Sequence, residues 1–300
     1  MLFATLLALG SAVVHASWNV LIKTGEDRAM SAWGQFAAAA VVSLLGLLVV
    51  GGPGWHAMPY LVGSGLVHVV YLEALVGAYS HGDFSMSYPL ARGTGAVGAA
   101  VGSVIVLGDH LSPWAWVAIA VAGVGLVSLR AGAGVPAADD VVLGDGGDAT
   151  VTVARRPPVD LALAWAVLTG AAIATYSLID SAGSRSSSSG VSYGLAVCAS
   201  AGIAVTVANA VRPSRRARAS SMLTNWRRNV AGGVGTVVAY TLVLVAVRHA
   251  PVGYVTMLRE SSVVLGAVVG WLWLGEAFGR RRLISSSVIL VGLVLLVAVE

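Results

Sequence analysis

The sequence predicts an all-α integral membrane protein with ten transmembrane helices, arranged as two inverted five-helix repeats. Three observations predict this fold: the composition, the length of the apolar segments and an internal duplication. Of the 300 residues, 57% are hydrophobic and 11% are charged, and the mean hydropathy is +0.84. A soluble domain carries roughly 25% charged residues, so this composition indicates a protein that crosses a membrane many times.

The apolar segments are long enough to span a bilayer, which requires about 20 mostly apolar residues for each helix. The first segment lacks the basic start of a signal peptide and carries His15, Trp18 and Asn19, so we interpret it as a retained helix. The predicted segments are 2–22, 31–50, 59–79, 84–107, 114–130, 160–181, 190–210, 229–249, 252–274 and 282–299.

The duplication relates Arg92 to Arg259, which lie 167 residues apart. The same offset aligns Leu107-Gly108-Asp109 with Leu274-Gly275-Glu276 and Gly125-Leu126-Val127 with Gly292-Leu293-Val294. A polar stretch over 131–159 separates a first repeat, 1–130, from a second repeat, 160–300. Because each repeat has an odd number of spans, the second enters the membrane from the opposite side, as in many alternating-access carriers.

The basic residues favour an orientation with both termini outside the cell. Most of the 18 Lys and Arg residues follow odd-numbered segments, and the positive-inside rule places such loops in the cytoplasm. The same rule explains the net charge of +4 without a nucleic-acid partner. Abundant Ala, Gly and Arg with a single lysine suggest a high-GC bacterial genome, and hence a multi-pass protein of the bacterial inner (plasma) membrane.

Several site types are excluded by their residue requirements. Cys198 is the only cysteine, which excludes an internal disulfide and a cysteine-based metal cluster. The chain has no HExxH zinc motif and no Walker sequence, so it does not hydrolyse ATP. The pattern Gly93-x-Gly95-x-x-Gly98 lies inside a predicted membrane helix without a preceding strand, and the serine-centred pattern at 190–194 lacks a strand-turn-helix context. We therefore expect no catalytic residue, metal or cofactor.

Polar side chains within the first half form one candidate pathway. His15 and Asn19 are four residues apart and share a helix face, with Trp18 beside them. Glu73 stands among apolar residues in the middle of its predicted segment, where it either faces a cavity and exchanges protons or forms a static pair with an arginine, Arg92 or Arg259. Tyr88 and Arg92 also lie four residues apart and therefore on one face, next to Pro89.

The second half contributes the matching candidates. Arg259 and Glu260 are neighbours that point about 100° apart around a helix, so only one of them faces the cavity. Tyr176 and Asp180 share a face at the positions equivalent to His15 and its neighbours, although Asp180 lies near the predicted helix end, where solvation is an equal alternative. Tyr240 is a further candidate, with core packing as its alternative.

The order of several short motifs resembles the EamA branch of the drug/metabolite transporter superfamily over nearly the whole chain. The motifs are His15-Ala-Ser-Trp-Asn19, Gly82-Asp-Phe-Ser85 leading to Tyr88-Pro-Leu-Ala-Arg92-Gly93, Tyr176-Ser-Leu-Ile-Asp180, Arg259-Glu-Ser261 and the duplicated Leu-Gly-acid element. The resemblance implies ten helices around a central cavity and export of small metabolites or toxic analogues. It also implies termini in the cytoplasm, against the charge count, and a shorter linker than 131–159.

The leading hypothesis is therefore a secondary active transporter that exports a small metabolite by alternating access, coupled to protons or to exchange. Its pathway comprises His15, Trp18, Asn19, Glu73, Tyr88, Arg92, Tyr176, Asp180, Tyr240, Arg259 and Glu260. One arginine of the pair Arg92 and Arg259 binds an anionic substrate group or forms a gate. The expected partners are a small molecule and the bilayer, and a homodimer is compatible with the sequence. The alternative is a polytopic enzyme acting on lipid-linked phosphate intermediates, and a non-transporting scaffold is disfavoured by the cost of inserting the charges.

Overall fold

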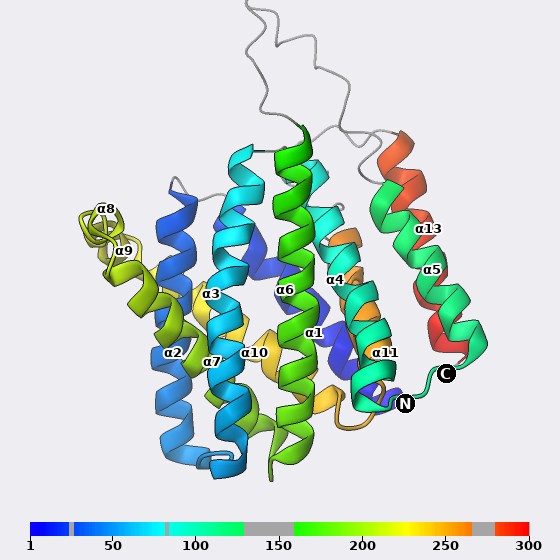
Figure 1. The fold of residues 1–300 in the computed structure, drawn as a ribbon, viewed down its shortest axis with the longest axis horizontal. Helices are drawn as coiled ribbons and strands as arrows, with labels where there is room; N and C mark the ends of the chain where they lie inside the picture. The colour runs from blue at the N-terminus through cyan, green and yellow to red at the C-terminus, as the bar shows by residue number, and fades with distance from the viewer. Residues whose placement is uncertain (24–26, 82–83, 129–158, 266–279, 300) are drawn as a thin grey trace, which may run out of the picture.

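The computed structural model describes the chain apart from residues 24–26, 82–83, 129–158, 266–279 and 300, and Figure 1 shows its arrangement. The side chains of 18–23, 28, 79, 84–89, 159–160 and 280–283 are also outside the description. The described part is helical and contains no strand. Helices are the expected form of these apolar segments, because a helix satisfies its backbone hydrogen bonds internally where lipid offers none.

The helices of the first half begin and end close to the predicted bounds. They are α1 (Leu2–Lys23), α2 (Arg28–Val50), the short 3-10 helix η1 (Trp55–Ala57), α3 (Met58–His81), α4 (Phe84–Leu107) and α5 (Pro113–Ser128). Asp27 caps the start of α2 by accepting a hydrogen bond from the backbone N–H of Met30 at 3.1 Å. The linker predicted at 131–159 lies outside the described residues except for Val159, which begins the next helix.

The second half comprises α6 (Val159–Ser186), α7 (Gly190–Ala210), α8 (Pro213–Arg216), α9 (Ser220–Thr224), α10 (Trp226–Ala246), α11 (Val252–Arg259) and α13 (Arg280–Val299). The prediction ended α6 too early, at 181. The helix continues through a serine-rich stretch in which Ser181 and Ser186 donate to the backbone oxygens of Ser177 and Ala182 at 2.6 and 2.8 Å, so these polar side chains are satisfied within the helix. The helices α8 and α9 lie where a loop was expected.

Six helices of the described chain are long and apolar enough to cross a membrane. They cover 29–50, 55–78, 90–107, 161–186, 190–210 and 226–246, and shorter apolar helices cover 2–17, 113–128 and 284–299. The ninth predicted segment, 252–274, is described only to residue 265. These helices identify an integral membrane protein, whereas the number of ten spans stays a prediction.

The most extensive helix contacts join the two halves of the chain. Helix α2 packs on α7, α1 packs on α10, and α6 packs on both α3 and α4. Glycines allow these close approaches: a Cβ atom added at Gly202 would lie 2.3 Å from the carbonyl oxygen of Phe36, and one at Gly125 would lie 2.7 Å from the Ile289 side chain. Helices α5 and α13 pack on each other at one edge of the bundle (Figure 1, right).

The helix α4 ends in a turn that needs glycine. Gly108 has φ +70°, a left-handed conformation that is costly for other residues, and the N–H of Asp109 then donates to the carbonyl of Ser103 at 3.1 Å. This turn brings the Asp109 carboxylate to Arg185 at the end of α6, 2.6 Å away, and to the backbone N–H of Val252 at the start of α11, 2.7 Å away. The first copy of the duplicated Leu-Gly-acid element therefore joins α4, α6 and α11.

The helix containing Arg259 is interrupted at Glu260. The N–H of Glu260 donates to the carbonyl of Met257 and the N–H of Val263 donates to the carbonyl of Glu260, both at 2.9 Å and both over three residues. Residues 261–265 are helical again. Such tight turns inside a helix often mark hinges or functional positions. The backbone of α4, by contrast, is continuously helical on both sides of Pro89.

Candidate functional site

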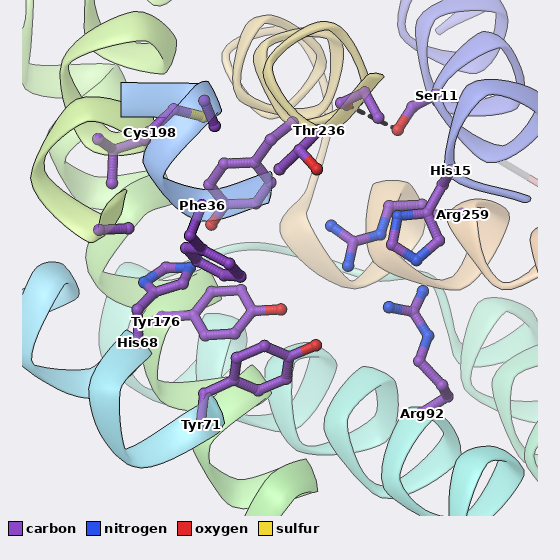
Figure 2. A pocket seen from close by; sticks show the side chains of 15 residues that line it. Ser11, His15, Phe36, His68, Tyr71, Arg92, Tyr176, Cys198, Thr236 and Arg259 are labelled. Carbon is purple, nitrogen blue, oxygen red and sulfur yellow. Dashed lines mark hydrogen bonds between the residues drawn. The ribbon is translucent and has the colours of Figure 1, made fainter. Parts of the chain in front are cut away.

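A pocket lies between α1, α2, α3, α4, α6, α7, α10 and α11, so both halves of the chain contribute to it. Figure 2 shows two different sides of this pocket, one formed by basic side chains and the other by aromatic rings. Its lining consists of Ser11, His15, Phe36, Ala39, His68, Tyr71, Arg92, Tyr176, Val197, Cys198, Ala201, Thr236, Ala239, Tyr240 and Arg259.

The basic side carries His15, Arg92 and Arg259 (Figure 2). Arg92 is held by Glu260 through two hydrogen bonds, with Nη2 at 2.6 Å from Oε1 and Nε at 3.0 Å from Oε2. Both residues are buried, and this paired geometry is the strongest that a guanidinium forms with a carboxylate. The pair joins α4 of the first half to the break after α11 in the second, and it neutralises the charge of Arg92.

Arg259 has a different environment although it occupies the equivalent sequence position. Arg259 is 6% exposed, and no carboxylate pairs with it among the described side chains. Its Nε atom is buried without a hydrogen-bond partner, and its guanidinium carbon lies 6.0 Å from the centre of the Tyr240 ring. A ring contact alone compensates a buried cation weakly, so the pocket holds a positive charge without an acidic partner in the described chain.

The aromatic side is built from α2, α3, α6 and α10. The ring of His68 stacks on Tyr176 with centroids 4.4 Å apart and planes at 25°, and Tyr71 and Tyr240 meet Tyr176 edge-on at 5.6 and 6.0 Å. Phe36 meets His68 edge-on at 6.3 Å. These rings offer flat apolar faces and several polar edges to a ligand.

Asp180 lies behind the aromatic side and is fully buried. Its carboxylate accepts hydrogen bonds from Ser64 Oγ at 2.9 Å, from the Tyr193 hydroxyl at 3.2 Å and from the Tyr240 hydroxyl. Ser64 also contacts Nδ1 of His68 at 3.2 Å. Tyr240 and His68 line the pocket, so this network connects the buried carboxylate to the site.

Glu73 lies outside the pocket lining. Its carboxylate bonds Arg212 and Arg215, with N–O distances of 2.6 and 2.7 Å, at the end of α7 and in α8. Its side chain is 30% exposed. The structure thus fits neither sequence interpretation of Glu73, a side chain in the cavity or a pair with Arg92 or Arg259. Helix α3 presents it instead towards the end of the bundle where α8 begins, next to two arginines that follow α7.

The remaining sequence-predicted residues divide into two groups. His15, Arg92, Tyr176, Tyr240 and Arg259 line one pocket, and Asp180 and Glu260 bond members of it. The side chains of Trp18, Asn19 and Tyr88 lie outside the described residues.

Sequence reasoning did not select several residues that the structure adds to the lining. His68 and Tyr71 are the clearest, and they formed a visible stripe of polar aromatic residues in the third segment. Ser11, Phe36 and Thr236 carried no comparable signal. No group of three metal-ligating side chains occurs in the part of the chain that the structure describes.

Comparisons with known proteins agree with the helical membrane fold. Residues 160–298 match the model of the EamA-like transporter family. Among solved structures, 28 chains match, and one of them, titled only "Crystal structure of protein", covers 99% of this chain and 99% of its own length with a TM-score of 0.70 at 16% identity. At that identity the likeness describes the fold alone. No curated protein sequence matches the chain.

Proposed function

Because the chain belongs, through residues 160–298, to the EamA-like transporter family of the drug/metabolite transporter superfamily, we propose that it is a secondary carrier that exports a small anionic metabolite by alternating access. The environment of Arg259 is the observation that supports an anionic substrate. It is buried, it lines a pocket between both halves, and it has no carboxylate partner among the described side chains. A cation in such a position costs a few kcal/mol to insert, which a bound anion offsets.

The contacts between halves support the proposal of two inverted repeats, 1–130 and 160–300. In the predicted alignment, α1 corresponds to α6, α2 to α7, α3 to α10 and α5 to α13. Exchanging the halves then converts the contact of α1 with α10 into that of α6 with α3, and leaves the contacts of α2 with α7 and α5 with α13 unchanged. Figure 1 shows α1 starting at the lower end of the bundle and α6 at the upper end, as inversion requires.

The two arginines then have separate roles. Arg92 forms the fixed pair with Glu260 across the halves, and Arg259 binds the substrate anion. The aromatic side, with Tyr176 and Tyr240, favours a flat aromatic body on that anion. His15, Trp18, Asn19 and Tyr88 belong to the same pathway in this proposal, whereas Glu73 braces the end of the bundle.

Export across a bacterial inner membrane also suits an anionic substrate. The inside of the cell is electrically negative. Each 100 mV of membrane potential therefore favours outward movement of a monoanion by roughly 2.3 kcal/mol. By the positive-inside rule, the basic loops favour a cytoplasmic location for the end of the bundle that carries α8. An impermeant biotin reagent tests this orientation on single-cysteine variants at exposed positions: Trp55 at one end and Val211 at the other.

Binding to the purified protein tests the substrate class. Phenylacetate is the anionic aromatic probe, cyclohexylacetate matches its size and charge without the aromatic ring, and phenylacetamide keeps the ring without the charge. We expect phenylacetate to bind best, and Arg259→Gln to weaken it roughly 30-fold or more, which corresponds to the lower limit of about 2 kcal/mol for truncating a buried charge pair. Arg218→Gln is the matched control, because Arg218 pairs with Asp27 at the surface.

Equal binding of the anion and the amide, or equal binding by wild type and Arg259→Gln, would reject the anionic site. Proteoliposomes distinguish transport from catalysis. Movement of labelled phenylacetate without chemical change supports the carrier, after subtraction of leakage through protein-free vesicles. Turnover of a phosphorylated lipid by the purified protein would support the polytopic enzyme instead.

A further inference from the structure

Asp180 differs from the other acidic residues whose partners the structure describes. Asp27, Glu73, Asp109 and Glu260 each pair with at least one arginine, at N–O distances of 2.6 to 2.8 Å. Asp180 has no such partner among the described residues, and it is the acid buried most completely, with 0% exposure. Its charge is therefore met by hydroxyl groups and not by a cation.

The surroundings of Asp180 come from every helix packed around that part of α6. Ser64 and His68 lie on α3, Tyr193 and Cys198 on α7, and Tyr240 on α10. Beyond Tyr240 lies Arg259 of α11, across the tyrosine ring. Tyr60 of α3 faces Tyr193, Tyr176 precedes Asp180 by one turn on α6, and the described part of α4 brings Arg92 to the far side of the pocket.

Hydroxyl groups suit both protonation states of a carboxyl group. A serine or tyrosine hydroxyl donates to the ionised form and accepts from the protonated form after a rotation of its hydrogen. An arginine partner, by contrast, only donates and therefore holds a carboxylate in its charged form. The shell of Ser64, Tyr193 and Tyr240 thus permits a change of charge at Asp180 that the paired acids do not permit.

We propose that Asp180 is a proton-binding site whose occupancy controls how tightly the two halves of the carrier are held together. The inference rests on the proposed function, since it assigns the coupling ion of that carrier. It replaces Glu73, whose two arginine partners oppose protonation, as the acid that exchanges a proton.

The mechanical link is the contact between Ser64 and Asp180. Ser64 belongs to the first half and Asp180 to the second, and their bond of 2.9 Å crosses from α3 to α6. Hydrogen bonds to an ionised group are roughly twice as strong as those between neutral groups. Proton binding therefore weakens this contact and the one from Tyr240, and it allows α3 to move relative to α6 and α10 during alternating access.

Infrared difference spectroscopy tests the proton site without any substrate. Purified protein in nanodiscs is taken from alkaline to acidic pH, and the carbonyl stretch of a newly protonated carboxylic acid is followed. We expect this band in wild type and in Glu73→Gln, and its loss in Asp180→Asn. Tyr240→Phe gives a second readout in case the asparagine variant misfolds. It keeps the acid but removes one of its hydrogen bonds, so the band should be retained at a shifted frequency.

A band that persists unchanged in Asp180→Asn and is unaffected in Tyr240→Phe would overturn the assignment.

The control over conformation is measured separately by spin labels at Trp55, before α3, and Ser188, after α6, in a Cys198→Ala background. Both label sites are exposed. We expect the distance distribution between the labels to shift with pH in this background and to become insensitive to pH when Asp180→Asn is added.

A distribution that is the same at all pH values in the Asp180-containing protein would refute the control over conformation, even if the infrared band is lost. Both measurements omit the organic substrate, so they remain decisive if phenylacetate fails to bind. In that case the anionic site is rejected and the proton site is retained. Phenylacetate binding that depends on Arg259, together with an infrared band that is unaffected by Asp180→Asn, would retain the anionic site and reject the proton site.

Discussion

Removal of the negative charge from Glu260 should destabilise the fold more than any comparable change at the surface. The Arg92–Glu260 pair is 5% and 4% exposed at its side chains, and Glu260→Gln leaves the Arg92 guanidinium buried without its carboxylate. Breaking such a pair by removal of one partner costs about 3–5 kcal/mol. Part of this cost is the desolvation of the Arg92 charge after it loses this carboxylate, so the protein with both residues neutral should lose less.

The assay is reversible unfolding of the purified protein in mixed micelles with an increasing fraction of sodium dodecyl sulfate. Arg218→Gln provides the surface comparison, because its pair with Asp27 is 52% and 36% exposed and should contribute about 0–1 kcal/mol. The cap that Asp27 provides for α2 stays intact in this control. The double variant Arg92→Met/Glu260→Gln should recover stability relative to Glu260→Gln alone. Equal losses for Glu260→Gln and Arg218→Gln, or additive losses in the double variant, would refute the reasoning.

Two further predictions concern packing and the end of the bundle, and both are measured as the free energy of unfolding in the same micelles. Gly202→Ala should destabilise the contact of α2 with α7 by about 1–3 kcal/mol, because its Cβ would lie 2.3 Å from the backbone oxygen of Phe36. The control Gly52→Ala should be neutral, since no atom lies within 4 Å of its added Cβ. Equal effects of the two substitutions would contradict the packing model. Asp109→Asn should cost about 1.5–3 kcal/mol because it removes charged hydrogen bonds to Arg185 and to the start of α11; a neutral result would show that this contact is not retained in the bilayer protein.

The sequence predicted the helices well because long apolar segments have few alternatives in lipid. The segment 190–210 agrees with α7 to the residue, and 84–107 agrees with α4. The predicted end of α6 was wrong because the serines after Asp180 are polar in a hydropathy profile, whereas their hydroxyls bond the backbone of the preceding turn. That error made Asp180 look interfacial when it is fully buried.

The sequence selected several residues that the structure brings to one pocket, but it did not indicate how they pair. Buried ionisable residues stand out in an apolar segment, so Arg92, Arg259 and Glu260 were all recognised as candidates. The choice between the two arginines depends on a contact over 168 positions, between Arg92 and Glu260, which no local pattern specifies. Glu73 was placed in the cavity because its neighbours in the sequence are apolar, while its partner Arg215 lies in a polar segment far along the chain.

The pairing of α5 with α13 has a consequence for the order of assembly. A ribosome delivers the fifth segment to the membrane long before the last one, yet the last helix is the main neighbour of α5. The glycine face of α5, at Gly125, thus meets only lipid or the insertion machinery until Ile289 and Gly292 arrive. Truncation of the final helix, α13, should therefore leave a chain that inserts normally but is recognised by quality-control proteases at the exposed flank of its first half.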